Sequence, residues 1–97
     1  MSPSELRPAG DRPSLTLLVR AYCHLCEEMR AAVAPIAAAA GLELREIDVD
    51  SDRALEERWG ERVPVLLGGV RELCHYRLDA DALDAFLDEF ARRRDLG

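Results

Sequence analysis

The chain has 97 residues, of which 48% are hydrophobic, and carries a formal net charge of −6. A chain of this length forms one domain with room for one site. The acidic charge argues against a nucleic-acid partner, because phosphate binding needs a basic surface, and no apolar run approaches the ~20 residues of a membrane helix. All basic side chains are arginines, so any cation beside a reactive thiol must be arginine or histidine.

Residues 1–13 are rich in proline, serine and charged residues, and they lack the apolar stretch of a secretory signal. They predict a flexible tail, followed by a folded domain over residues 14–94. The chain contains three cysteines, an odd number that does not suggest a secreted disulfide framework. We therefore expect a cytoplasmic protein, in which a close pair of cysteines serves redox or metal chemistry more often than structure.

The first half of the folded region predicts a strand, a helix and a second strand. Residues 15–20 are apolar and rich in β-formers, which indicates a buried strand. Across residues 23–40 apolar side chains recur three and four positions apart, which predicts a helix of about sixteen residues. Residues 42–49 alternate imperfectly and predict another strand, after which Asp50 or Ser51 can cap a short helix.

The second half predicts a hairpin and a last helix. Residues 63–67 form an apolar strand with a proline near its start, where the missing N–H is tolerated. Gly68-Gly69 predicts a two-residue turn into an antiparallel strand over residues 70–76, and Asp79 caps a final amphipathic helix. Together the elements predict an α/β fold of order βαβαββα, with a four-stranded mixed sheet flanked by three helices.

Cys23 and Cys26 lie at the corner between the first strand and the first helix. At the start of a helix, the sulfur of Cys23 faces free backbone amides and the positive end of the helix dipole, which stabilise a thiolate. Cys26 follows one turn later, close enough for a disulfide. The pair predicts a redox couple in which Cys23 attacks a disulfide and Cys26 resolves the mixed disulfide that forms.

Three residues around the cysteine pair are further candidates for the site. Arg20 and His24 carry or can acquire positive charge and are predicted to tune the pKa of Cys23. Tyr22, directly before the nucleophile, is predicted to flank a substrate groove. For Arg20 and His24 an ordinary solvated position is the alternative, and Tyr22 could instead only cover the edge of the core.

The order of elements and four short motifs resemble the thioredoxin fold and, more narrowly, the small bacterial glutaredoxin-like proteins. The motifs are C-x-L-C, I-D-V-D, W-G and R-V-P-V-L, at residues 23–26, 47–50, 59–60 and 62–66. The similarity covers roughly residues 14–91. The resemblance implies that Val63-Pro64 is a cis peptide bond beside the site, with the backbone of Val63 available to pair with an extended substrate or with glutathione.

The resemblance is incomplete at the start of the last helix. Glutaredoxins that bind glutathione well usually have two glycines and an aspartate there, whereas this chain has Tyr76-Arg77-Leu78-Asp79. We therefore expect no bound cofactor and at most a weak role for glutathione as a co-substrate.

Two other classes of function compete with a redox enzyme. Cys74 and His75 could join Cys23 and Cys26 in a zinc or iron–sulfur site, although neighbouring residues of a strand point to opposite faces. Cys74 is more simply explained as a small core residue, and the predicted edge strand that carries it lies away from the start of the first helix, so we expect no metal site. A thioredoxin-fold interaction module without catalysis is the third class.

We favour a monomeric thiol-disulfide oxidoreductase that acts on a disulfide-containing protein or a small thiol, with no nucleic-acid or membrane partner.

Overall fold

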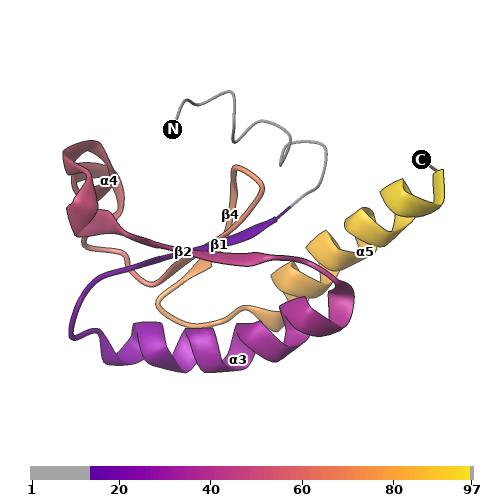
Figure 1. Ribbon diagram of the computed structural model, residues 1–97, viewed down its shortest axis with the longest axis horizontal. Helices are drawn as coiled ribbons and strands as arrows, with labels where there is room; N and C mark the ends of the chain where they lie inside the picture. The colour runs from indigo at the N-terminus through magenta and orange to yellow at the C-terminus, as the bar shows by residue number, and fades with distance from the viewer. Residues whose placement is uncertain (1–13, 97) are drawn as a thin grey trace.

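The computed structural model describes residues 14–96, so the tail predicted for residues 1–13 lies outside the described part. The elements follow the predicted order (Figure 1). They are β1 (Leu15–Val19), α3 (His24–Ala40), β2 (Leu44–Asp48), the short 3-10 helix η1 (Val49–Ser51), α4 (Arg53–Trp59), β3 (Val65–Gly68), β4 (Arg71–His75) and α5 (Ala80–Leu96). No helix in this range is long and apolar enough to cross a lipid bilayer.

The strands form one mixed sheet in the order β2-β1-β3-β4. β1 is parallel to β2 and antiparallel to β3, and β3 is antiparallel to β4. Figure 1 shows α3 and α5 along one face of the sheet and α4 on the opposite side. This arrangement confirms the predicted thioredoxin-like α/β fold.

Each face of the sheet has its own buried cluster, because successive side chains of a strand point to opposite faces. Leu15 and Leu17 of β1 pack toward α3 and α5, where they meet Val33 and Leu83. Leu18 points the other way and packs with three residues on the α4 side, namely Val49, Trp59 and Val65. Full burial of a leucine contributes about 1.5–3 kcal/mol, so both faces stabilise the sheet.

The predicted position of the hairpin turn is wrong by one residue. Gly68 ends β3 and pairs with Arg71, which places Gly69 and Val70 in the turn. Gly68 is buried against α5, where an added Cβ would lie 2.7 Å from the ring of Phe86. Gly69 has a φ of 63°, a backbone conformation that favours glycine. Gly68 is therefore required by packing against α5, and Gly69 by the backbone conformation of the turn.

The predicted cap of the short helix is also displaced. Residues 49–51 form η1, so α4 begins later and its N-cap is Asp52, whose carboxylate accepts a hydrogen bond from the amide of Ala54 at 2.8 Å. The cap of the last helix is confirmed, because the carboxylate of Asp79 accepts a hydrogen bond from the amide of Ala82 at 3.1 Å.

Candidate functional site

The residues predicted for the site lie at one end of the sheet. Leu18, near the end of β1, pairs with Val65 at the start of β3, and Val19 pairs with Asp48 at the end of β2. Val65 also pairs with His75 at the end of β4. The loops that leave β1, β2 and β4 and the loop that enters β3 therefore share this end, which we call the cysteine end of the sheet.

Cys23 is the N-cap of α3, and Cys26 lies one turn into the helix. The backbone at Cys23 is extended, and its sulfur accepts a hydrogen bond from the amide of Cys26 at 3.1 Å. The two residues form a disulfide, with their Cα atoms 5.2 Å apart. When the pair is reduced, an amide that points at this sulfur and the helix dipole both favour a thiolate on Cys23.

The two cysteines differ in exposure because only one belongs to the buried stripe of α3. Cys26 is 1% exposed and shares that stripe with Met29 and Val33. Cys23, at the cap, is half-buried. A substrate disulfide can therefore approach Cys23, whereas Cys26 lies behind it. This is the order of exposure that attack by Cys23 and resolution by Cys26 require, and the roles themselves remain predictions.

Tyr22 and His24, on either side of Cys23, are both open to solvent. Tyr22 is fully exposed and has a φ of 59°, which is uncommon for a residue with a bulky side chain. His24 is the first residue of α3 and is exposed. Their positions fit the predicted groove flank and tuning charge without testing either role.

Val63 and Pro64 enter β3 at the cysteine end. The peptide bond between them is cis. Pro64 is buried, and its carbonyl accepts a hydrogen bond from the amide of Tyr76 at 2.9 Å. Val63 is half-buried and packs against the α4-side cluster through its side chain. The backbone of Val63 thus lies at the same end of the sheet as Cys23, where the predicted pairing with a substrate would take place.

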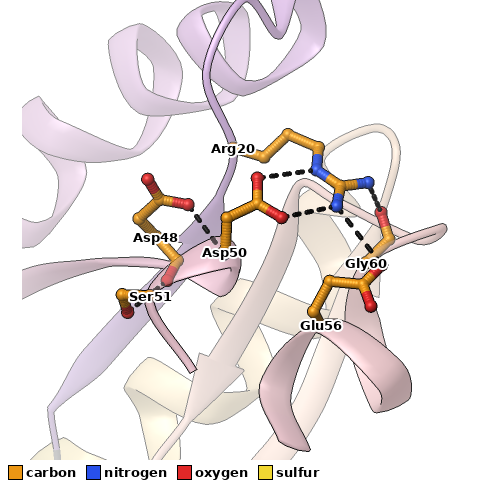
Figure 2. Close-up of polar contacts among 6 residues, drawn as sticks. All are labelled: Arg20, Asp48, Asp50, Ser51, Glu56 and Gly60. Atoms are coloured by element: carbon orange, nitrogen blue, oxygen red, sulfur yellow. Dashed lines mark hydrogen bonds and ion pairs between the residues drawn. The ribbon is translucent and has the colours of Figure 1, made fainter. Parts of the chain in front are cut away.

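Arg20 has other partners than the thiol for which it was predicted (Figure 2). Its guanidinium donates hydrogen bonds to both carboxylate oxygens of Asp50, at 2.7 and 3.1 Å, to Glu56 at 3.3 Å and to the carbonyl of Gly60 at 3.0 Å. The hydrogen bonds from Arg20 hold the pKa of Asp50 below its usual value. Two carboxylates compensate the charge of Arg20, so these contacts do not support tuning of Cys23.

The Arg20 contacts instead join three elements behind the cysteine corner. Arg20 follows β1, Asp50 lies in η1, Glu56 lies in α4, and Gly60 is the C-cap of α4. Asp50 is itself held by Asp48, whose carboxylate accepts a hydrogen bond from the amide of Asp50 at 2.8 Å (Figure 2). The segment that leads from β1 to Cys23 is therefore anchored at its start.

A second group at the cysteine end was not predicted from the sequence. Glu72 of β4 forms an ion pair with Arg62 and lies 2.8 Å from the Nδ1 of His75. Burial pushes the pKa of Glu72 up, but hydrogen bonds from Arg62 and His75 outweigh burial and leave it below its usual value. In a regular strand residues 72 and 75 would face opposite sides. The pairing of β3 with β4 is irregular at this point, which allows them to meet.

Tyr76 follows this group. From the sequence it is notable only because it stands where glutaredoxins that bind glutathione well usually have glycine. It has a φ of 64°, its ring packs edge-on against His75 with centroids 4.7 Å apart, and its hydroxyl donates a hydrogen bond to the carbonyl of Glu61 at 3.0 Å. The predicted strand over residues 70–76 includes Tyr76, whereas β4 ends at His75, so no signal in the sequence indicated that Tyr76 lies in the loop beyond the strand.

Comparisons with known proteins agree with the fold. The family described as Glutaredoxin-like domain (DUF836) matches residues 14–88. The chain belongs to this family. An uncharacterised protein of Mycobacterium tuberculosis, Rv0508, is 32% identical over 79 residues, which cover 76% of this chain and 81% of the relative.

Two solved structures resemble this glutaredoxin-like domain. The solution structure of protein Ne2328 from Nitrosomonas europaea is 38% identical, with a TM-score of 0.69 over 76% of this chain and 89% of that one. A point-mutant thioredoxin of Halobacterium salinarum has a TM-score of 0.61 over 93% of this chain and 86% of its own, at 24% identity. The thioredoxin likeness concerns the fold alone.

Cys74 of the glutaredoxin-like domain is a core residue, as predicted. It is 9% exposed and lies in the cluster on the α3 and α5 side of the sheet. Burial raises the pKa of its thiol, and a hydrogen bond with the backbone of Asp79 offsets this only in part. Over residues 14–96 no three His, Cys, Asp or Glu side chains are grouped so that they could hold a metal ion. The alternative site of Cys23, Cys26, Cys74 and His75 is thus not assembled.

Proposed function

We propose that this glutaredoxin-like domain is a thiol-disulfide oxidoreductase that uses Cys23 and Cys26 to reduce disulfides in other proteins. The observation that carries the proposal is the position of Cys23 at the N-cap of α3, where its sulfur accepts the amide of Cys26 at 3.1 Å. A half-buried sulfur beside an unpaired helix terminus is the setting in which a cysteine becomes a reactive thiolate.

The reaction proceeds in two exchanges. The Cys23 thiolate attacks one sulfur of the substrate disulfide, so that a Cys23–substrate bond forms and the other substrate sulfur leaves as a thiolate that takes up a proton. Cys26, as a thiolate, then attacks the sulfur of Cys23 and releases the second substrate thiol. Two electrons have passed to the substrate, and the domain is left with the Cys23–Cys26 disulfide. A thiol reductant must restore the dithiol before the next turnover.

The proposed substrate side is the loop into β3. The backbone of Val63, ahead of the cis bond to Pro64, would pair with an extended segment of the substrate, and Tyr22 would flank it. His24, when protonated, would favour the thiolate form of Cys23. A cytoplasmic setting, where thiols are kept reduced, would hold the pair as a dithiol, and we propose that the protein works there as a monomer.

Glutathione is the less suitable partner. The net charge of −6 repels a tripeptide with two carboxylates. Asp79 and Asp81 add negative charge at the start of α5, and the carboxylate of Asp79 is already engaged as a helix cap. Backbone pairing with a protein segment needs no charge match.

Single substitutions of the cysteines test the proposal. Cys23→Ser should abolish reduction of a protein disulfide, and Cys26→Ser should stop turnover and accumulate a covalent adduct between Cys23 and the partner, detectable by mass spectrometry. Cys74→Ala is the control and should leave the rate unchanged. Full activity of Cys23→Ser, or an adduct on Cys74 instead of Cys23, would refute the assignment.

A further inference from the structure

Two residues other than glycine have a positive φ within residues 14–96, and both are tyrosines. Tyr22 has a φ of 59° and Tyr76 a φ of 64°. This conformation disfavours bulky side chains, and residues that adopt it gather at binding and active sites. Tyr22 precedes Cys23 and Tyr76 follows β4, so both lie at the cysteine end of the sheet. The fold thus tolerates two strained tyrosines at the end of the sheet that carries the disulfide.

Tyr76 is fixed to the loop that enters β3 at two points. Its amide donates a hydrogen bond to the carbonyl of Pro64 at 2.9 Å, and its hydroxyl donates one to the carbonyl of Glu61 at 3.0 Å. The residue therefore spans the stretch between positions 61 and 64, which contains Val63. Tyr76 therefore lies beside Val63, the residue whose backbone pairs with the substrate in the proposed function.

The ring of Tyr76 is held from behind and still open in front. His75 packs edge-on against it, and His75 is in turn held by Glu72, which forms an ion pair with Arg62. Even so, 46% of Tyr76 is exposed. A rigid tyrosine that is already ordered offers contact area at little cost in conformational entropy, which is why tyrosines are enriched in interfaces.

We propose that Tyr76 is a specificity-determining residue, whose ring contacts the side chains that flank the cysteine of an extended peptide substrate. This inference rests on the proposed function and names its substrate class, a disulfide in a peptide segment with an apolar or aromatic residue beside the cysteine. A small disulfide that lacks such neighbours gains nothing from the ring.

The test measures mixed-disulfide formation on Cys23 in a Cys26→Ser background, which stops the reaction after the first exchange. One probe is oxidised glutathione. The other is an uncharged peptide with its cysteine between leucine and phenylalanine, joined to a second copy by a disulfide. Rates of adduct formation are followed by mass spectrometry in proteins with Tyr76, Tyr76→Phe and Tyr76→Gly.

Tyr76→Gly should lower the rate with the peptide about tenfold, the loss of roughly one aromatic contact, and change the rate with oxidised glutathione by less than about twofold. Glycine relieves the positive φ, so this variant should fold. Tyr76→Phe keeps the ring but loses the bond to Glu61, and should lower the peptide rate only about two- to threefold. Val70→Ala is the matched control, because Val70 is 97% exposed in the turn at the other end of the sheet. It should alter neither rate.

The outcomes separate the two claims. In one outcome, the ratio of the adduct-formation rates with the peptide and with oxidised glutathione is unchanged in Tyr76→Gly, either because both rates fall together or because neither falls. That result would overturn the specificity role and leave the proposed function standing. The absence of any adduct on Cys23 with either probe, in the protein that keeps Tyr76, would refute the proposed function and this inference with it.

Discussion

Cys74 and the Cys23–Cys26 pair lie in one small domain, yet their surroundings differ in kind. Cys74 is enclosed by apolar side chains of the sheet, α3 and α5, and burial raises the pKa of its thiol. Cys23 caps a helix, accepts a backbone amide and is half-buried. The start of its loop is anchored by the charged contacts of Arg20. Close packing disfavours the thiolate of Cys74, whereas a free helix terminus favours the thiolate that we propose for Cys23.

A change of side-chain volume should lower the stability of the fold more around Cys74 than at the corner that carries Cys23 and Cys26. Leu83 is 1% exposed and shares the cluster of Cys74. Leu83→Ala should lower the free energy of unfolding by about 2–5 kcal/mol, because it removes buried area and leaves a cavity. Urea denaturation measures the loss, and the exposed neighbour change Asp84→Ala is the control. A loss below about 1 kcal/mol would show that Cys74 is not enclosed by close packing.

Added volume should also destabilise this region, by a smaller amount. Gly68→Ala places a Cβ 2.7 Å from the ring of Phe86, and overpacking of this kind costs about 1–3 kcal/mol. Gly69→Asn is the matched control, because asparagine tolerates the positive φ and, apart from the adjacent residues of the chain, no described atom lies within 4 Å of an added Cβ there. If thermal unfolding ranks the two variants the other way round, the packing of α5 on the hairpin is wrongly described.

Charge changes should affect the cysteine corner instead. Arg20→Gln removes the bonds to Asp50, Glu56 and Gly60 and should lower the midpoint of thermal unfolding, while Arg20→Lys recovers only part of the loss because lysine lacks the planar fork. Since two carboxylates compensate Arg20, Arg20→Gln should shift the pKa of the Cys23 thiol by less than about half a unit. A rise well beyond that, measured by alkylation at a series of pH values, would show that Arg20 tunes Cys23.

The smallest expected effect is a dependence on acid. The pKa of Asp50 is depressed in the folded protein by the hydrogen bonds from Arg20. A carboxylate with a depressed pKa stabilises the fold above its unfolded pKa of about 3.9, and this contribution is lost as the pH falls through the folded pKa. The midpoint of thermal unfolding should therefore fall more between about pH 4 and 2 in the unmodified protein than in Asp50→Asn. Parallel pH curves for the two proteins would show that the pair contributes nothing.

Much of the fold could be predicted because its signals are local. The strand before Cys23, the helical stripe that contains Cys26 and the cap at Asp79 each depend on residues within about two turns of one another. The cysteine corner follows directly, since it needs only a strand, a helix start and the motif between them.

The parts that were missed depend on distant residues or on backbone detail. The partners of Arg20 lie 30, 36 and 40 positions away along the chain, so no local pattern links them. Gly68 is required by its contact with the ring of Phe86 in a distant helix, so the Gly-Gly pair alone does not show which of the two glycines belongs to the turn. Glu72 meets His75 where the pairing of the strands is irregular.

The central claim is that the N-terminus of α3 makes Cys23 the reactive thiol. The direct measurement is the rate of alkylation of each cysteine in the fully reduced protein as a function of pH, read by mass spectrometry of the separated peptides. We expect the rate at Cys23 to be half-maximal below the ordinary thiol pKa of about 8.5, with Cys74 reacting more slowly at every pH. Faster alkylation of Cys74, or a Cys23 that titrates like a free thiol, would contradict the account.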